Sequence, residues 1–192
     1  MSSEIKGITR ELKTHIQILG SLVGFMWVLE LINRLIFHGA LVQFGIIPRS
    51  FIGLRGIFLA PFLHASIGHL LANTLPLIIL GWLIMLRETK DFFTVSMITM
   101  IVSGLGVWLF AGVNTLHVGA SGVIFGYLGY LLLRGYFERS VVSIFLSLIV
   151  GAVYGGLIWG VLPTIPGISW QGHLFGFIGG GIAARYLAKR KL

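Results

Sequence analysis

The sequence predicts an all-α polytopic membrane protein: a bundle of six transmembrane helices with a long membrane-associated first loop. Hydrophobic residues make up 56% of the 192-residue chain and charged residues 10%, whereas a soluble domain carries about 25% charged residues. Six apolar stretches each come near the ~20 residues that a helix needs to cross a bilayer. The mean hydropathy of +0.96 also indicates that the bilayer is the solvent of this chain.

Residues 1–15 are polar and mixed in charge, and we expect them to form a cytoplasmic N-terminal tail. They lack the apolar core and small-residue cleavage site of a secretory signal peptide. Residues 16–192 then form one six-helix domain. The expected spans cover residues 16–37, 67–86, 92–113, 120–136, 141–162 and 171–187.

The first connection, residues 38–66, is long and largely apolar, and glycines and prolines such as Pro48 and Pro61 interrupt it. Proline cannot continue a helix without losing a hydrogen bond, so this segment is too interrupted to span the bilayer. We expect it to lie partly in the membrane interface and to pack against the bundle.

The net charge of +8 indicates membrane orientation rather than nucleic-acid binding, because the basic residues gather at alternate span ends. Lys and Arg are enriched in cytoplasmic loops, which predicts that both termini are cytoplasmic, in the inner (plasma) membrane. Ser121 and His173 then lie at a similar depth, toward the outer face. The basic residues on the predicted inner side are Lys6, Arg10, Lys13, Arg87, Lys90, Arg134, Arg139, Arg185, Lys189, Arg190 and Lys191.

Polar residues inside apolar spans are candidates for function because each is costly in lipid. Ser121 begins the fourth span, His173 lies near the start of the sixth, and His69 and Asn73 share one face of the second. His64 lies at the edge of the same region. The outer half of the bundle therefore collects a hydroxyl, imidazoles and a carboxamide.

Glycines at four-residue spacing let two helices approach closely in a membrane. Gly122 and Gly126 in the fourth span, facing Gly176 and Gly180 in the sixth, would bring Ser121 and His173 within hydrogen-bond reach. That contact is typical of a nucleophile and its general base. The alternative is that these glycines serve packing alone.

No Asp or Glu neighbours Ser121 or His173 in the sequence, and Glu30 is the one acidic residue placed inside a span. These residues support a serine–histidine dyad, with the base held by packing, rather than a triad. Phe125, one turn after Ser121, could stack on the imidazole. His69, Asn73 and the backbone N–H of Ser121 are the available oxyanion donors; interhelical hydrogen bonding is the structural alternative for His69 and Asn73.

Metal and cofactor chemistry is not expected. His64 and His69 are five positions apart and so face different sides of a helix, and HExxH is absent. The chain has no cysteine, which excludes a disulfide frame and a thiol nucleophile.

Three motifs in this order, HASIGHLLAN, GASG around Ser121 and GHLFGFIGG, resemble the rhomboid intramembrane serine proteases of the bacterial, six-span core type. The resemblance implies that Ser121 is the nucleophile and His173 the general base. It implies an oxyanion site made by His69, Asn73 and the Ser121 amide, with His64, Gly119 and Phe125 in supporting positions. It also implies a membrane-embedded first loop and a cap at residues 163–170.

This chain departs from the family pattern at two places. Phe125 stands where some rhomboids carry a tyrosine, and Leu54-Arg55 is the nearest dipeptide to a Trp-Arg pair often found in the first connection. The first departure keeps ring stacking and loses a phenol hydrogen bond. The second leaves the shape of the first connection open.

We therefore expect an intramembrane serine endopeptidase that cleaves single-span membrane proteins near the outer face. Its partners would be membrane lipids and those substrates, with no nucleic acid and no cofactor. A non-catalytic rhomboid-like client binder and a small transporter or proton relay are the alternatives. The fifth span, with Gly155, Gly156, Trp159 and Gly160, is a candidate gate, and whether Glu30 reaches the polar cluster is left open.

Overall fold

A computed structural model describes residues 3–164 and 167–190 of the chain, and within them the protein is entirely helical apart from loops and one isolated β-bridge. The α-helices are α1 (Ser3–Leu35), α2 (Gly56–Leu59), α3 (Ile67–Met85), α4 (Thr89–Phe110), α5 (Ser121–Glu138), α6 (Val141–Tyr154) and α7 (Trp170–Lys189). The 3-10 segments are η1 (Ala40–Phe44), η2 (Ile52–Arg55), η3 (Ala60–Phe62) and η4 (Gly155–Val161).

Four helices among the described residues are long and apolar enough to cross a bilayer: α1, α3, α4 and α6 continued by η4. The protein is therefore a multi-pass membrane protein. Each of the six expected spans coincides with a helix, although α5 and α7 fall outside that criterion of length and composition. The first helix begins at Ser3, so the described part of the expected tail is helical and continuous with α1.

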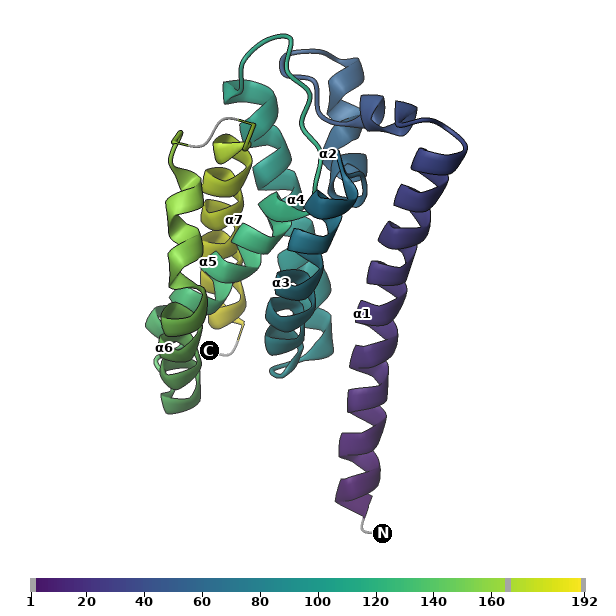
Figure 1. The fold of residues 1–192 in the computed structure, drawn as a ribbon. Coiled ribbons are helices and arrows are strands. Elements are labelled where there is room, and N and C mark those ends of the chain that lie inside the picture. The colour runs from purple at the N-terminus through teal and green to yellow at the C-terminus, as the bar shows by residue number, and fades with distance from the viewer. Residues whose placement is uncertain (1–2, 165–166, 191–192) are drawn as a thin grey trace.

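The centre of the bundle is the pair α5 and α7, which α4 also contacts (Figure 1). A Cβ placed on Gly176 of α7 would fall on the carbonyl of Gly122 in α5, and one on Gly180 would fall on the carbonyl of Gly126. The two backbones are thus in direct contact at the glycine pairs that the sequence singled out. Small residues permit this approach.

The segment that follows α4 turns back down into the bundle before α5 begins, so α5 starts well inside the molecule (Figure 1). Ile46 and His117 hold this segment to the first connection by an antiparallel β-bridge with N–H···O distances of 2.9 and 3.0 Å. The N–H of Gly119 also donates to the carbonyl of Ala60 at 2.8 Å. The first connection therefore packs against the bundle, as expected, and fixes the approach to Ser121.

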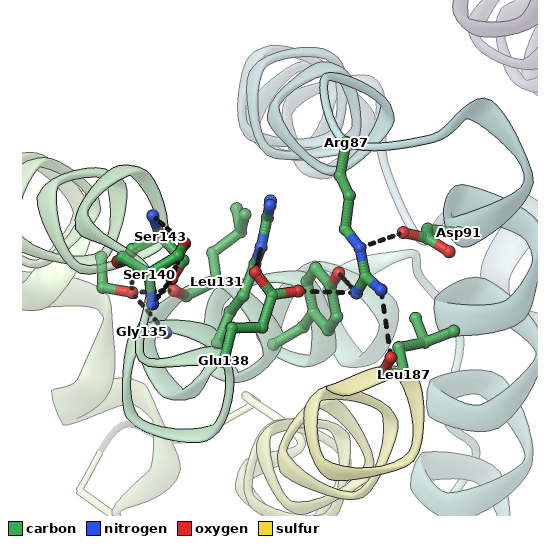
Figure 2. A network of polar contacts seen from close by, with 11 residues as sticks. Arg87, Asp91, Leu131, Gly135, Glu138, Ser140, Ser143 and Leu187 are labelled. Atoms are coloured by element: carbon green, nitrogen blue, oxygen red, sulfur yellow. Dashed lines mark hydrogen bonds and ion pairs between the residues drawn. The ribbon is translucent and has the colours of Figure 1, made fainter. Parts of the chain in front are cut away.

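At the opposite end, where both described ends of the chain lie, charged side chains are buried together (Figure 2). Arg87, in the turn before α4, pairs with Asp91 at 3.2 Å and with Glu138 at 2.7 Å, and its side chain is 5% exposed. It also donates to the carbonyl of Leu187 at 3.0 Å. Arg134 Nε pairs with the second carboxylate oxygen of Glu138, Oε2, at 2.9 Å. This network, Arg87, Asp91, Arg134 and Glu138, ties α4, α5 and α7 together.

Serines fasten α6 beside α5 at the same end (Figure 2). Ser140 and Ser143 cap the start of α6 reciprocally, each side chain accepting from the other's backbone N–H. The Ser147 hydroxyl accepts from the N–H of Gly135 at 3.0 Å and donates to the carbonyl of Leu131 at 2.6 Å. The α6 helix is thus well anchored at this end.

Candidate active site

Ser121 is the first residue of α5, and its side chain is partly buried. The first N–H groups of a helix have no partner within that helix. The backbone N–H of Ser121 therefore lies beside its own hydroxyl as an available donor. This arrangement follows from the inward turn of the segment between α4 and α5.

His173, in the first turn of α7, meets Ser121 directly. The distance from His173 Nε2 to Ser121 Oγ is 2.9 Å, and His173 is 7% exposed. The contact expected from the glycine spacing is therefore present. Hydrogen-bond reach between a hydroxyl and an imidazole is the geometry of an activated nucleophile.

The other nitrogen of the same ring has a partner that the sequence did not reveal. His173 Nδ1 lies 2.8 Å from the carbonyl oxygen of Gly160 in η4. A carbonyl can only accept, so Nδ1 carries the proton of the neutral ring and Nε2 presents its lone pair to Ser121. The Ser121 hydroxyl therefore donates to Nε2. The expectation that packing alone holds this histidine is incomplete, because a main-chain acceptor also holds it.

Phe125 stacks on His173 as expected. The ring centroids are 3.9 Å apart and the planes differ by 7°. Phe125 lies one turn after Ser121 on α5 and is 5% exposed. The stack keeps the imidazole plane in line with the serine.

His69 and Asn73 of α3 converge on the backbone just before Ser121. Gly119 has a φ of +118°, and a Cβ there would collide with the His69 ring and lie 3.7 Å from the Asn73 amide nitrogen. Glycine is needed at this position both for its conformation and for this close approach. Within the described residues, the buried Nδ2 of Asn73 has no hydrogen-bond partner. A donor is thus available next to the serine.

His64 lies behind His69, outside the helices, and its side chain is fully buried. Its ring meets that of His69 edge-on, with centroids 5.1 Å apart and planes at 71°. Burial, assisted by the neighbouring His69, lowers the pKa of His64 from its ordinary value of 6.5 to about 4. His64 is therefore a neutral ring at pH 7 that supports His69 by packing.

Glu30 does not extend the dyad within the described residues. Its carboxylate, 2% exposed as a side chain, pairs with Arg34 on the same helix at 2.8 Å. Arg34 in turn donates to the carbonyl of Ala65 at 2.7 Å. Glu30 thus helps to hold α1 against the start of α3, and its charge lies close enough to His69 to act on that ring.

A small cavity of about 40 Å³ opens beside Ser121. Its lining includes Ser103, His117, Gly119 and Ser169 together with Ser121. A water needs about 10–15 Å³ of such volume and polar partners, so water has room next to the hydroxyl. The cavity lies where the first connection, α4, α5 and the start of α7 meet.

A second serine–histidine contact, which the sequence analysis missed, joins the same two segments. His117 Nδ1 lies 2.8 Å from Ser169 Oγ, and His117 Nε2 lies 2.7 Å from Thr115 Oγ1. Both pairs are 52 positions apart, with serine and histidine in the opposite order and an offset of four residues. The His117–Ser169 bond also anchors the described end of the expected cap, whereas residues 165 and 166 lie outside the described part of the chain.

Within the described residues, no group of three or more His, Cys, Asp or Glu side chains is arranged to hold a metal ion. His64 and His69 are neighbours through ring packing.

The fold and the site define a multi-pass helical membrane protein with a serine–histidine pair between its two central helices. Residues 52–190 match the family model of the Rhomboid domain. The chain belongs to the rhomboid family, which includes intramembrane serine proteases.

The chain is also similar to mycobacterial proteins and to one plant rhomboid-like protein. The chain is 42% identical over 175 residues to an uncharacterized protein of Mycobacterium tuberculosis, covering 86% of this chain and 72% of that relative. It is 40% identical over 174 residues to an uncharacterized protein of Mycobacterium leprae, covering 86% and 68%. Rhomboid-like protein 4 of Arabidopsis thaliana is 32% identical over 127 residues, which is 62% of this chain and 30% of that relative.

Proposed function

We propose that this rhomboid-family protein is an intramembrane serine endopeptidase that cleaves single-span membrane proteins near the outer face of the membrane. The observation that carries the proposal is the 2.9 Å contact of Ser121 Oγ with His173 Nε2, with the Nδ1 proton held on the far side of the ring. A hydroxyl that donates to the free ring nitrogen of a histidine is the arrangement of a nucleophile and its general base.

The reaction would proceed in two acyl-transfer steps. Ser121 Oγ attacks the scissile carbonyl while His173 Nε2 takes its proton, and the resulting imidazolium gives that proton to the leaving amine. The peptide C–N bond breaks and an acyl ester on Ser121 remains. A water from the cavity beside Ser121 then loses a proton to His173 and attacks the ester. The bond between the acyl carbon and Ser121 Oγ breaks, His173 gives its proton to Oγ, and the new carboxylic acid leaves.

The developing oxyanion would be met by the N–H of Ser121 and the side chains of His69 and Asn73. The approach of both side chains to Gly119 and the unpaired amide of Asn73 support this assignment. Donors fixed before the reaction starts cost no reorganisation during it, which is why they stabilise a transition state strongly.

The proposal includes six membrane spans, with α5 and α7 crossing at the centre of the bundle. It places the end that holds Arg87 and both described chain ends in the cytoplasm, because most basic residues lie there. Ser121 then lies below the outer surface, where water can reach it from outside. Membrane lipids and single-span proteins are the proposed partners.

The test uses the purified chain in liposomes with a single-span model substrate and a serine-directed fluorophosphonate. Ser121→Ala and His173→Ala should abolish cleavage and labelling, whereas Ser21→Ala, which changes an exposed serine on α1, should keep both. Cleavage retained by Ser121→Ala would contradict the proposal. Client binding without any cleavage or labelling by wild type would favour a non-catalytic binder instead.

A further inference from the structure

We infer that the main-chain carbonyl of Gly160 is a positioning group for His173 and takes the place that a carboxylate holds in a Ser-His-Asp triad. The inference rests on the proposed function, since it assigns a role within the same site. Its basis is the 2.8 Å contact between Gly160 O and His173 Nδ1, directly opposite the bond to Ser121.

The carbonyl does two things that a triad carboxylate does. It selects the tautomer with the proton on Nδ1, and it keeps accepting that proton when Nε2 takes a second one from Ser121. A hydrogen bond from a charged donor is stronger than one from a neutral donor, so the bond tightens as His173 becomes an imidazolium. The proton of Ser121 stays on Nε2 until the leaving amine takes it.

The carboxylates that the structure describes inside the bundle are engaged elsewhere. Glu30 pairs with Arg34, and Asp91 and Glu138 pair with Arg87 at the far end of the bundle. Among the described groups, the acceptor facing His173 Nδ1 is the Gly160 carbonyl. The base is thus oriented by backbone rather than by a side chain.

Residue 160 has to be a glycine for this contact to form. A Cβ there would lie 2.7 Å from Cζ of Phe125 and 3.2 Å from Nδ1 of His173, both closer than ordinary contacts. The absence of a side chain lets η4 close onto the stacked rings. Gly155 and Gly156, in the same segment, have open space where a Cβ would stand.

The carbonyl sits on a short segment at the edge of the bundle. None of the residues of η4 is buried, and η4 packs against α7 and its own helix α6. Trp159, next to Gly160, is 69% exposed. His173 therefore takes its acceptor from η4, so the tautomer of the base depends on the contact between η4 and α7.

The experiment compares wild type, Gly160→Ala and Gly156→Ala as full chains in detergent micelles. Four quantities are measured: the rate of fluorophosphonate labelling at Ser121, kcat and KM for a single-span substrate, and the unfolding temperature. The ¹⁵N signals of His173, assigned by their loss in His173→Gln, report which ring nitrogen carries the proton.

Gly160→Ala should lower both the labelling rate and kcat by at least about tenfold, a part of what a positioned general base contributes. KM and the unfolding temperature should stay near those of Gly156→Ala, which itself should remain within about twofold of wild type in rate. Wild type should show a protonated Nδ1 and a bare Nε2 at neutral pH, and Gly160→Ala should show a mixture of tautomers.

Equal rates for Gly160→Ala and Gly156→Ala would overturn the inference. A Gly160→Ala variant that reacts slowly but keeps the wild-type tautomer of His173 would also overturn it. The added methyl group would then be blocking the access of substrate to Ser121. A wild-type ring protonated on Nε2 would overturn it even if Gly160→Ala failed to fold. By contrast, wild type that carries the Nδ1 proton and yet never reacts with the phosphonate would end the proposed function and leave the positioning contact standing.

Discussion

Gly176 of α7 lies against the backbone of Gly122 in α5, so closely that a Cβ on Gly176 would fall on the carbonyl oxygen of Gly122. Gly122 follows Ser121 directly, and Gly176 follows His173 by one turn. The separation of these two backbones therefore sets the distance between the proposed nucleophile and its base.

Gly176→Ala should push the two helices apart, because the carbonyl that the methyl meets is backbone and cannot rotate away. Overpacking of this kind costs about 1–3 kcal/mol of stability, and the longer Ser121–His173 distance should lower kcat by at least about tenfold. Unfolding temperature and peptide cleavage in liposomes measure the two effects. Gly24→Ala, which adds a methyl to α1 in open space, is the control; a Gly176→Ala protein as active as this control would contradict the expectation.

His69→Ala and Asn73→Ala should each slow cleavage by about 10²–10³-fold through kcat, the typical effect of losing one oxyanion donor. KM should change little, since the donors act on charge that appears in the transition state. Thr74→Ala is a matched control on the same helix, because Thr74 bonds Trp27 rather than facing the serine. Losses confined to KM would assign His69 and Asn73 to substrate binding instead.

The sequence predicts those features of the fold and the site that follow from local residue patterns. Apolar length located the helices, and four-residue glycine spacing directly after Ser121 and His173 predicted that their helices touch. Local rules of this kind succeed because a membrane helix has to satisfy its own backbone and pack on small residues. The family model then confirmed the resemblance that the three motifs indicated.

The parts that the sequence did not predict depend on contacts made by main chain or across distant turns. Every residue has a main-chain carbonyl, so the role of the Gly160 carbonyl cannot be predicted from residue type. The glycine itself is not distinctive, because glycine occurs at 27 positions of this chain. Arg87, Asp91 and Glu138 sit at helix ends, where charged residues are ordinary in a membrane protein. Their mutual burial follows from how the start of α4 meets the ends of α5 and α7, which no local pattern specifies.

Arg87→Ala should destabilise the protein by about 3–5 kcal/mol, because it leaves the buried Asp91 without its partner and leaves Glu138 with Arg134 alone. Lys90→Ala, which breaks an exposed pair with Glu88, should cost less than about 1 kcal/mol. Unfolding in a denaturing detergent series measures both. Cleavage per folded molecule should be unchanged in both variants, since Arg87 lies at the other end of the bundle from Ser121. A mild effect of Arg87→Ala would mean that water reaches this network.

Acid should destabilise the fold through His64. Its pKa is about 4 in the folded protein against an ordinary 6.5, so between these values the unfolded chain binds a proton that the folded chain does not. Stability then falls as the pH drops from about 6.5 toward 4, and above 6.5 this contribution is fully present. The unfolding temperature of wild type should accordingly be lower at pH 4.5 than at pH 7.

His64→Asn should flatten that pH dependence, because the substituted side chain does not titrate. Some slope should persist, since burial also lowers the pKa of His117. His38→Asn is the control: His38 is exposed, and its φ of +49° is a conformation that Asn adopts readily. If His64→Asn and His38→Asn show the same pH dependence as wild type, the acid sensitivity arises elsewhere and His64 is protonated in the folded protein without penalty.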